Sequence, residues 1–165
     1  MKQEGLVPWM LYKKYRLYDE GMEIMIPSHL KQADSFIPSA HSWMSEDRRL
    51  VINVARGGAD LPEMNLSLRL NEYYKKFSKD ISNFECRHIK KRRINGQTYG
   101  EMQYLSQMMG YCFFNIFLLG AYEGRELIVT IQCIHYEAKA NMHIFENISD
   151  SLRFLRKRKE DMGDF

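Results

Sequence analysis

The most apolar stretch of the chain, residues 111–133, predicts a pair of antiparallel strands rather than a membrane span. A helix that crosses a bilayer needs about 20 apolar residues in succession. Here the run is interrupted at Asn115 and again by a charged cluster around Gly124. Its aromatic and β-branched residues suit strands, and Gly124 can supply the positive φ of a tight turn. We therefore expect a hairpin with strands over 111–120 and 125–136, the first strand being central because it is apolar on both faces.

Three other pairs of short alternating runs predict further hairpins. Their turns are Asp19-Glu20-Gly21, Ser45-Glu46-Asp47 and Asn95-Gly96. The Asn-Gly pair is the strongest of these signals, because both central residues of a type I′ turn adopt positive φ. It predicts strands over 84–94 and 97–106. Pro27 is expected to end the second strand of the first hairpin, because proline cannot continue a hydrogen-bonded ladder.

Two segments change to helical spacing. Leu66, Leu70 and Phe77 recur at this spacing, and Asn65 is a candidate N-cap. A second stripe consists of Met142, Phe145, Ile148, Leu152 and Leu155, with Asn141 as a candidate cap. The order hairpin, hairpin, helix, hairpin, hairpin, helix predicts an α+β fold. Its antiparallel β-sheet, built from successive hairpins, is flanked by two main amphipathic helices in an α/β/α-type sandwich.

Length and composition indicate one globular domain. The chain has 165 residues, 45% of them hydrophobic and 27% charged, and a net charge of +3. We expect a single domain over 1–165 with its core at about 14–156, a short N-terminal extension and a basic C-terminal tail. The first residues lack the apolar run of a secretory signal. Three cysteines, an odd number with no CxxC spacing, are typical of reduced thiols, so we expect a cytoplasmic protein without membrane insertion.

The element order, together with three short stretches, resembles the PsbP/DcrB-like superfamily. These stretches are GMEIMIP near the start, YEGRELIVTIQC late in the chain and FENISDSLRF near its end. The resemblance covers roughly residues 14–156 and implies an antiparallel sheet flanked by helices. The superfamily includes the Ran-binding nuclear import factor of yeast and the Eag-type chaperones of secretion effectors. The resemblance therefore implies a non-enzymatic binding module, and it transfers no individual site residue.

The sequence offers little for catalysis, and no metal or cofactor is expected. His135 and Glu137 would share one face of a strand, which we interpret as an edge pair rather than a ligand pair. Cys86 and His88 could form a nucleophile and base, but no third orienting group accompanies them, so a thiol hydrolase is the least favoured hypothesis. The segment 55–60, ARGGAD, could form an anion-binding nest, although a strand-exit loop is the better interpretation.

Two basic clusters could contact an acidic partner. The first consists of Arg87, Lys90, Lys91, Arg92 and Arg93, and the second of Arg153, Arg156, Lys157, Arg158 and Lys159. Lysine and arginine also protect edge strands from unwanted pairing, and cations suit a helix C-terminus. Because these structural reasons suffice, nucleic acid is not the expected partner.

The aromatic residues and 11 methionines favour a protein-binding function. Methionine is flexible and polarizable, so surfaces rich in it can adapt to varied apolar partners. We predict an apolar groove that includes Trp43, Met102, Tyr104, Met108, Met109 and Phe114, although core filling explains many such residues. The sequence thus predicts a protein- or peptide-binding module, with an apolar helix as one partner and homodimerisation as an option. A chaperone or adaptor for a secreted effector fits this description; the alternative is a nucleic-acid- or small-ligand-binding domain that uses the basic clusters or the sheet face.

Overall fold

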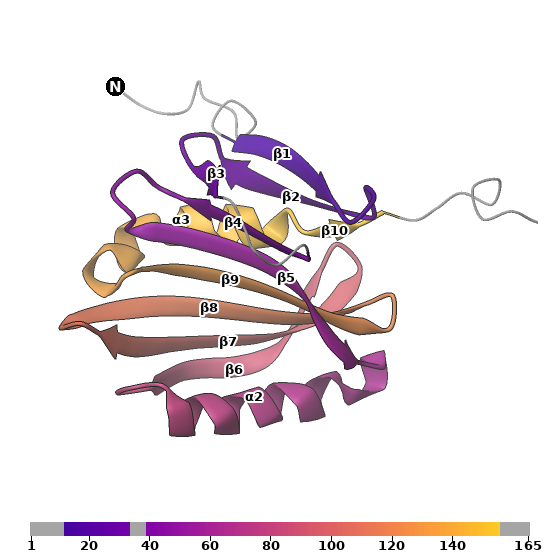
Figure 1. Cartoon of the computed structure of the whole chain (residues 1–165). Helices are drawn as coiled ribbons and strands as arrows, with labels where there is room; N and C mark the ends of the chain where they lie inside the picture. Colours follow the sequence, from indigo (N-terminus) through magenta and orange to yellow (C-terminus); the bar gives the residue numbers. More distant parts are fainter. Residues whose placement is uncertain (1–11, 34–38, 156–165) are drawn as a thin grey trace, which may run out of the picture.

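The fold is known from a computed structural model, which describes residues 12–33 and 39–155. These residues form ten strands, one 3-10 helix and two α-helices (Figure 1). In chain order they are β1 (Tyr12–Leu17), β2 (Met22–Pro27), β3 (Lys31–Ala33), β4 (Ala40–Met44), β5 (Leu50–Asp60), η1 (Glu63–Asn65), α2 (Leu66–Asp80), β6 (Glu85–Ile94), β7 (Gln97–Met108), β8 (Tyr111–Tyr122), β9 (Arg125–Ile134), α3 (His135–Asp150) and β10 (Arg153–Phe154).

Seven strands form one antiparallel sheet in the order β3-β4-β5-β9-β8-β7-β6. The predicted hairpin of the apolar stretch is confirmed, with Glu123 and Gly124 at φ of 51° and 77° in its turn. The Asn95-Gly96 hairpin is also confirmed, at φ of 48° and 84°. Because β8 has neighbours on both sides and side chains buried on both faces, it is a central strand of the sheet.

Helix α2 covers one face of this sheet over β7 and β8. Leu66 and Leu70 of the helix are buried against Met102 of β7 and Phe117 of β8. Asn65 occupies the position before the helix, as expected, but its side chain makes no capping hydrogen bond. Close packing is visible at Gly100, where an added Cβ would lie 2.8 Å from Leu70 Cδ2.

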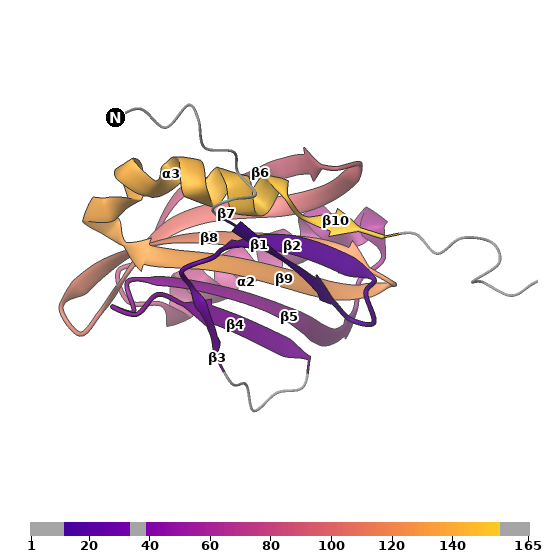
Figure 2. The same cartoon turned by 90° about the horizontal axis from the view of Figure 1, so that it is seen from above.

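The opposite face is covered by α3 together with a second, smaller sheet (Figure 2). The predicted first hairpin forms β1 and β2, but β2 pairs on its other side with β10, and neither strand pairs with the main sheet. Met22, Ile24 and Ile26 alternate along β2 and are fully buried, so one apolar face of this hairpin lies against the larger core. The described fold is therefore α+β. Hydrophobic alternation predicted the β1–β2 hairpin, but it did not show that this hairpin covers the main sheet instead of belonging to it.

The boundaries of the last helix differ from the prediction. Strand β9 ends at Ile134 and α3 begins at His135, so His135 and Glu137 lie on the first turn of a helix and do not form a strand pair. Asn141 is inside this helix, where its side chain donates to the Glu137 carbonyl oxygen, and it is not a cap. Leu152, which the predicted helical stripe included, is buried but lies beyond the end of α3 at Asp150. Neither α-helix of residues 12–33 and 39–155 has the length and apolar character needed to span a membrane.

Candidate binding site on strand β6 and the adjoining pocket

Strand β6 is an edge strand of the seven-stranded sheet. It pairs with β7 on one side and, within the described residues, with no strand on the other. Its sequence, ECRHIKKRRI, carries five arginine or lysine residues and one glutamate. Most of the strand is exposed. A long strand edge with unpaired backbone groups can accept an additional strand.

A β-bulge near the start of β6 decides where Cys86 and His88 point. Cys86 lies opposite Tyr104, whereas His88 lies opposite Gln103, so Arg87 is the extra residue. Cys86 consequently packs on the α2 side, while the imidazole of His88 lies on the α3 side, 2.6 Å from Glu101. The Cys86 thiol donates instead to the backbone carbonyl of His88, at 3.5 Å, and burial raises its pKa. The proposed nucleophile–base pair is therefore wrong.

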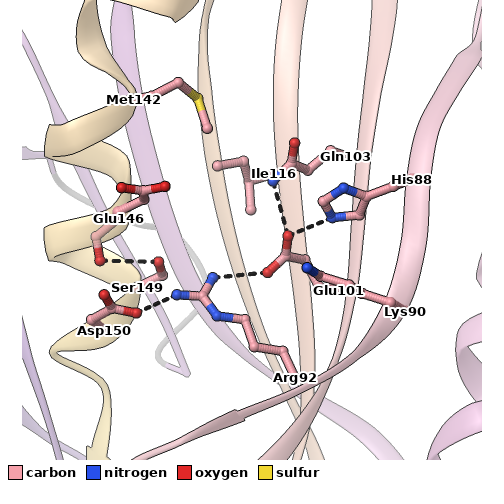
Figure 3. A pocket seen from close by; sticks show the side chains of 10 residues that line it. All are labelled: His88, Lys90, Arg92, Glu101, Gln103, Ile116, Met142, Glu146, Ser149 and Asp150. Atoms are coloured by element: carbon pink, nitrogen blue, oxygen red, sulfur yellow. Dashed lines mark hydrogen bonds and ion pairs between the residues drawn. The ribbon is translucent and has the colours of Figure 1, made fainter.

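The α3 side of β6 opens into a pocket of about 540 Å³ (Figure 3). Its walls come from β6, β7, β8 and α3, and they are formed by His88, Lys90, Arg92, Glu101, Gln103, Ile116, Met142, Glu146, Ser149 and Asp150. Charges of both signs line it. The pocket therefore does not present a surface of one sign to a polyanion such as nucleic acid.

Glu101 is the centre of the hydrogen-bond network in this pocket. Its side chain is only 2% exposed, and it accepts hydrogen bonds from Arg92 Nη1 at 2.8 Å and Gln103 Nε2 at 2.9 Å. His88 Nε2 lies 2.6 Å from the same carboxylate, and the second terminal nitrogen of Arg92 pairs with Asp150 of α3. Burial opposes ionisation of Glu101, but the hydrogen bonds and charges of Arg92 and His88 outweigh it, so the pKa of Glu101 lies below its ordinary value. The network fixes β6, β7 and α3 relative to one another.

The sequence did not single out Glu101. The available signal was a lone charged residue between Gly100 and Met102 in the strand predicted over 97–106. A charge at such a position is buried with partners or it destabilises the fold. The identity of those partners depends on the bulge and on the approach of α3.

Of the second predicted basic cluster, only Arg153 lies within the described residues. The β6–β7 turn does approach the end of α3, because Asn95 Nδ2 donates to the Leu152 carbonyl oxygen at 2.7 Å. Arg153, however, lies 3.9 Å from Glu23 of β2. The residues Arg156, Lys157, Arg158 and Lys159 lie outside the described residues. On β6, Arg87 pairs with Glu85 at 2.8 Å.

The predicted apolar groove is wrong for four of its six residues. Trp43 and Met102 are fully buried, and Tyr104 and Phe114 are nearly so. These side chains are covered by the protein itself. The Tyr15 ring lies 5.1 Å from Trp43, Phe77 of α2 lies 5.5 Å from Tyr104, and Phe145 of α3 lies 6.2 Å from Phe114, all between ring centroids. These four aromatic and methionine residues therefore form core, and they cannot line a surface groove.

Only Met108 and Met109 of that set are at the surface. They are 55% and 91% exposed at the turn between β7 and β8. The tip of this hairpin extends beyond both neighbouring strands, since β6 begins opposite Leu105 and β9 ends opposite Phe113. The two exposed methionines therefore lie at a projecting hairpin end.

The ARGGAD segment is part of strand β5, so the anion-binding nest is not formed. Gly57 and Gly58 do not have the positive φ that such a nest requires. A Cβ on Gly57 would lie 2.4 Å from Glu126 Oε1, so a carboxylate already occupies this position. That carboxylate accepts a hydrogen bond from Tyr73 at 2.7 Å and pairs with Arg69. Within residues 12–33 and 39–155, no three His, Cys, Asp or Glu side chains are arranged to hold a metal ion.

Comparison with known proteins gives information about the fold. No protein-family model and no curated protein matches the chain. Among solved structures, the cyanobacterial PsbP (CyanoP) of Synechocystis sp. PCC 6803 matches with a TM-score of 0.65 and 12% identity, over 87% of this chain and 92% of CyanoP. The chain has a PsbP-like fold.

Two further structures share the PsbP-like fold at similarly low identity. A Pseudomonas aeruginosa protein of unknown function has a TM-score of 0.59 and 13% identity, over 88% of this chain and 99% of its own. LpqN of Mycobacterium tuberculosis, which is involved in cell envelope biogenesis, has a TM-score of 0.50 and 10% identity, over 88% and 92%. At such identities the similarity extends to the PsbP-like fold and not to function.

Proposed function

We propose that this protein is a non-enzymatic protein- or peptide-binding module that takes up an extended segment of its partner along β6. The observation that carries the proposal is the outer edge of this ten-residue strand, with which no strand of residues 12–33 and 39–155 pairs. In β-strand addition, an extended peptide pairs with such a margin, main-chain hydrogen bonds give affinity, and neighbouring side chains give specificity.

The register of β6 indicates which backbone groups are available. Ile94 and Gln97 close the two-residue hairpin, and we expect them to form a hydrogen-bonded pair. Since hydrogen-bonded and non-hydrogen-bonded pairs alternate along an antiparallel ladder, the N–H and C=O groups of Ile89, Lys91 and Arg93 then point outward. A partner strand would bond to these three residues, while the hydrogen bonds between β6 and β7 stay intact.

The surroundings of β6 support protein over nucleic acid as the partner. The Glu101 network supports β6 from the α3 side, where Glu146 and Asp150 line the same pocket as Lys90 and Arg92. A phosphate backbone carries a charge on every nucleotide and would meet these carboxylates, whereas a peptide can place acidic residues only where basic side chains face it. We further propose an adaptor or chaperone role in the cytoplasm, for example for a secreted effector, in line with the sequence resemblance to Eag-type chaperones and the Ran-binding import factor.

The proposal can be tested with peptides selected on the full chain. A library of random 12-residue peptides displayed on phage is selected against the protein, and synthetic versions are measured by fluorescence anisotropy. Lys91→Pro removes one outward N–H, and Lys91→Ala is its matched control because it removes the same charge and keeps the N–H. We expect Lys91→Pro to weaken binding at least about tenfold, and Lys91→Ala to weaken it by only a few fold.

Hydrogen exchange provides a second readout of the same contact. Amides of Ile89, Lys91 and Arg93 should exchange more slowly when a selected peptide is bound, because these N–H groups become hydrogen-bonded. Thermal unfolding must first show that Lys91→Pro is folded. If the folded Lys91→Pro variant binds every selected peptide as tightly as Lys91→Ala does, strand addition on β6 is wrong.

A further inference from the structure

Three consecutive residues of β6 indicate which peptide sequence would pair with this strand. We infer that β6 recognises an acidic peptide in which two Asp or Glu residues are followed by an apolar residue, bound antiparallel to β6. This inference rests on the proposed function and specifies its partner. It derives from Ile89, Lys90 and Lys91, which follow the bulge and are all exposed.

The two lysines are the cations of β6 with the most freedom to meet a partner. Arg87 pairs with Glu85, and Arg92 is held between Glu101 and Asp150. Arg93 is held by the turn, where it donates to Thr98 Oγ1 and to the Gly96 carbonyl oxygen. For Lys90 and Lys91, by contrast, no carboxylate of the described residues is within ion-pair distance. They lie on opposite faces of the sheet, because successive strand residues alternate. A bound strand therefore meets one free positive charge on each face.

Ile89 adds an apolar contact beside these charges. Its side chain is 41% exposed, and it lies on the α2 side opposite Met102 of β7. An apolar side chain next to it on an added strand would continue the sheet surface over Ile89 and remove it from water. Lateral pairs of this kind stabilise neighbouring strands, and opposite charges do the same. The residue beside Ile89 should therefore be apolar.

Strand direction converts these neighbours into a sequence order. In an antiparallel pair the partner runs against β6, so its residues meet Lys91, then Lys90, then Ile89 in N-to-C order. The order is therefore acidic, acidic, apolar. A parallel partner would give the reverse order. Every pairing in the seven-stranded sheet is antiparallel, and antiparallel ladders are slightly more stable per residue.

The same charges argue against a second copy of β6 as the occupant. Self-pairing would bring lysine and arginine side chains of both copies together across the new ladder. Like charges opposite one another destabilise a strand pair, and lysine on an edge strand prevents such association. An acidic partner strand, by contrast, would form favourable charge pairs with these lysine and arginine side chains.

The decisive experiment is a charge exchange with defined peptides. Three 12-residue peptides with a common β-prone frame carry Asp-Glu-Val, Val-Glu-Asp or Lys-Lys-Val at the centre. Their affinities are measured by fluorescence anisotropy for the wild type and for Lys90→Glu/Lys91→Glu. A control double variant, Lys31→Glu/Arg48→Glu, changes the net charge equally. Its residues lie on β3, at the far margin of the sheet, and in the turn before β5.

We expect the wild type to bind the Asp-Glu-Val peptide on the order of tenfold more tightly than the Lys-Lys-Val peptide, and more tightly than the Val-Glu-Asp peptide. The preference for acidic over basic peptide should invert in Lys90→Glu/Lys91→Glu and persist in the control variant. Added salt should weaken the preference, because the charges are exposed.

Each contrary result identifies what is wrong. If acidic and basic peptides bind equally and both are lost in Lys91→Pro, the inferred charge recognition is overturned while strand addition stands. If Val-Glu-Asp binds as well as Asp-Glu-Val, the antiparallel order is overturned. If none of these peptides binds, and selection against the full chain yields none either, both the inference and the proposed function are overturned.

Discussion

Replacement of Glu101 by glutamine should destabilise the protein, because it removes a buried charge that several partners need. The side chain is 2% exposed and lies between His88 and Arg92, with Gln103 as a third neighbour. Glutamine preserves the size of the side chain and one carbonyl acceptor. It removes the negative charge and places an NH2 group where a carboxylate oxygen had accepted hydrogen bonds.

The size of the effect follows from the partner that remains. Removal of one member of a fully buried ion pair costs about 3–5 kcal/mol, because the other charge is left uncompensated. Here Arg92 keeps its contact with Asp150, and its side chain is partly exposed. We therefore expect Glu101→Gln to lower the free energy of unfolding by about 2 kcal/mol, below the fully buried range. For a domain of this length that loss corresponds to about 4–8 °C in Tm.

The pH dependence provides a sharper test than the magnitude. Since the pKa of Glu101 is lower in the folded protein than its ordinary value of 4.5, the stability that its ionisation contributes is present above about pH 4.5. It is lost as the pH falls through the lower, folded-state pKa. The difference in stability between wild type and Glu101→Gln should therefore shrink as the pH falls below about 4.5.

Urea unfolding followed by circular dichroism at pH 7, 5 and 4 measures these differences. Glu146→Gln is the matched control, because Glu146 lines the same pocket from α3 but is exposed, and its effect should stay within about 0.5 kcal/mol. In a double-mutant cycle, Arg92→Met and Glu101→Gln together should cost less than the sum of the single changes. A loss below 0.5 kcal/mol for Glu101→Gln, or a loss that does not depend on pH, would refute the reasoning.

Two further predictions concern backbone positions. Gly120→Ala should destabilise the protein by about 1–3 kcal/mol in urea unfolding, because the added Cβ in the central strand β8 would lie 2.8 Å from Tyr99 Cε2. Gly58→Ala is the control, because a Cβ there meets open space, and it should change stability by less than about 1 kcal/mol. Met109→Asn should raise Tm by about 1–3 °C, because Met109 has a φ of 53° that asparagine tolerates better. The exposed Met64, which lacks a positive φ, is the control position for the same substitution, and equal shifts at both sites would contradict this explanation.

The sequence by itself determined the hairpins, because their signals are local. Asn95-Gly96 and Gly124 need positive φ whatever surrounds them, and each of these turns is found where it was expected. The alternation in Met22, Ile24 and Ile26 likewise predicted one buried face. A PsbP-like fold was within reach of the sequence for the same reason, since the order of such elements defines it.

Only the tertiary structure decided which surfaces these elements cover. Burial of Trp43 requires Tyr15 from another sheet, and burial of Phe114 requires Phe145 from α3. Residue types that suit a core also suit an apolar groove, so composition could not separate the two. The choice depends on the path of helices and hairpins that come from distant parts of the chain.

In the candidate site, too, the sequence could not predict which individual side chains contact one another. The sequence indicated a basic strand, but one bulge residue, Arg87, turned Cys86 and His88 to opposite faces. That shift placed His88 beside Glu101, and the approach of α3 added Asp150 to Arg92. Sequence spacing determines local geometry, whereas buried charges take their partners from whatever the folded chain brings within hydrogen-bond distance. The arginines of β6, which are held by hydrogen bonds or ion pairs, could therefore be told apart from its two lysines, which have no carboxylate partner among the described residues, only after folding was known.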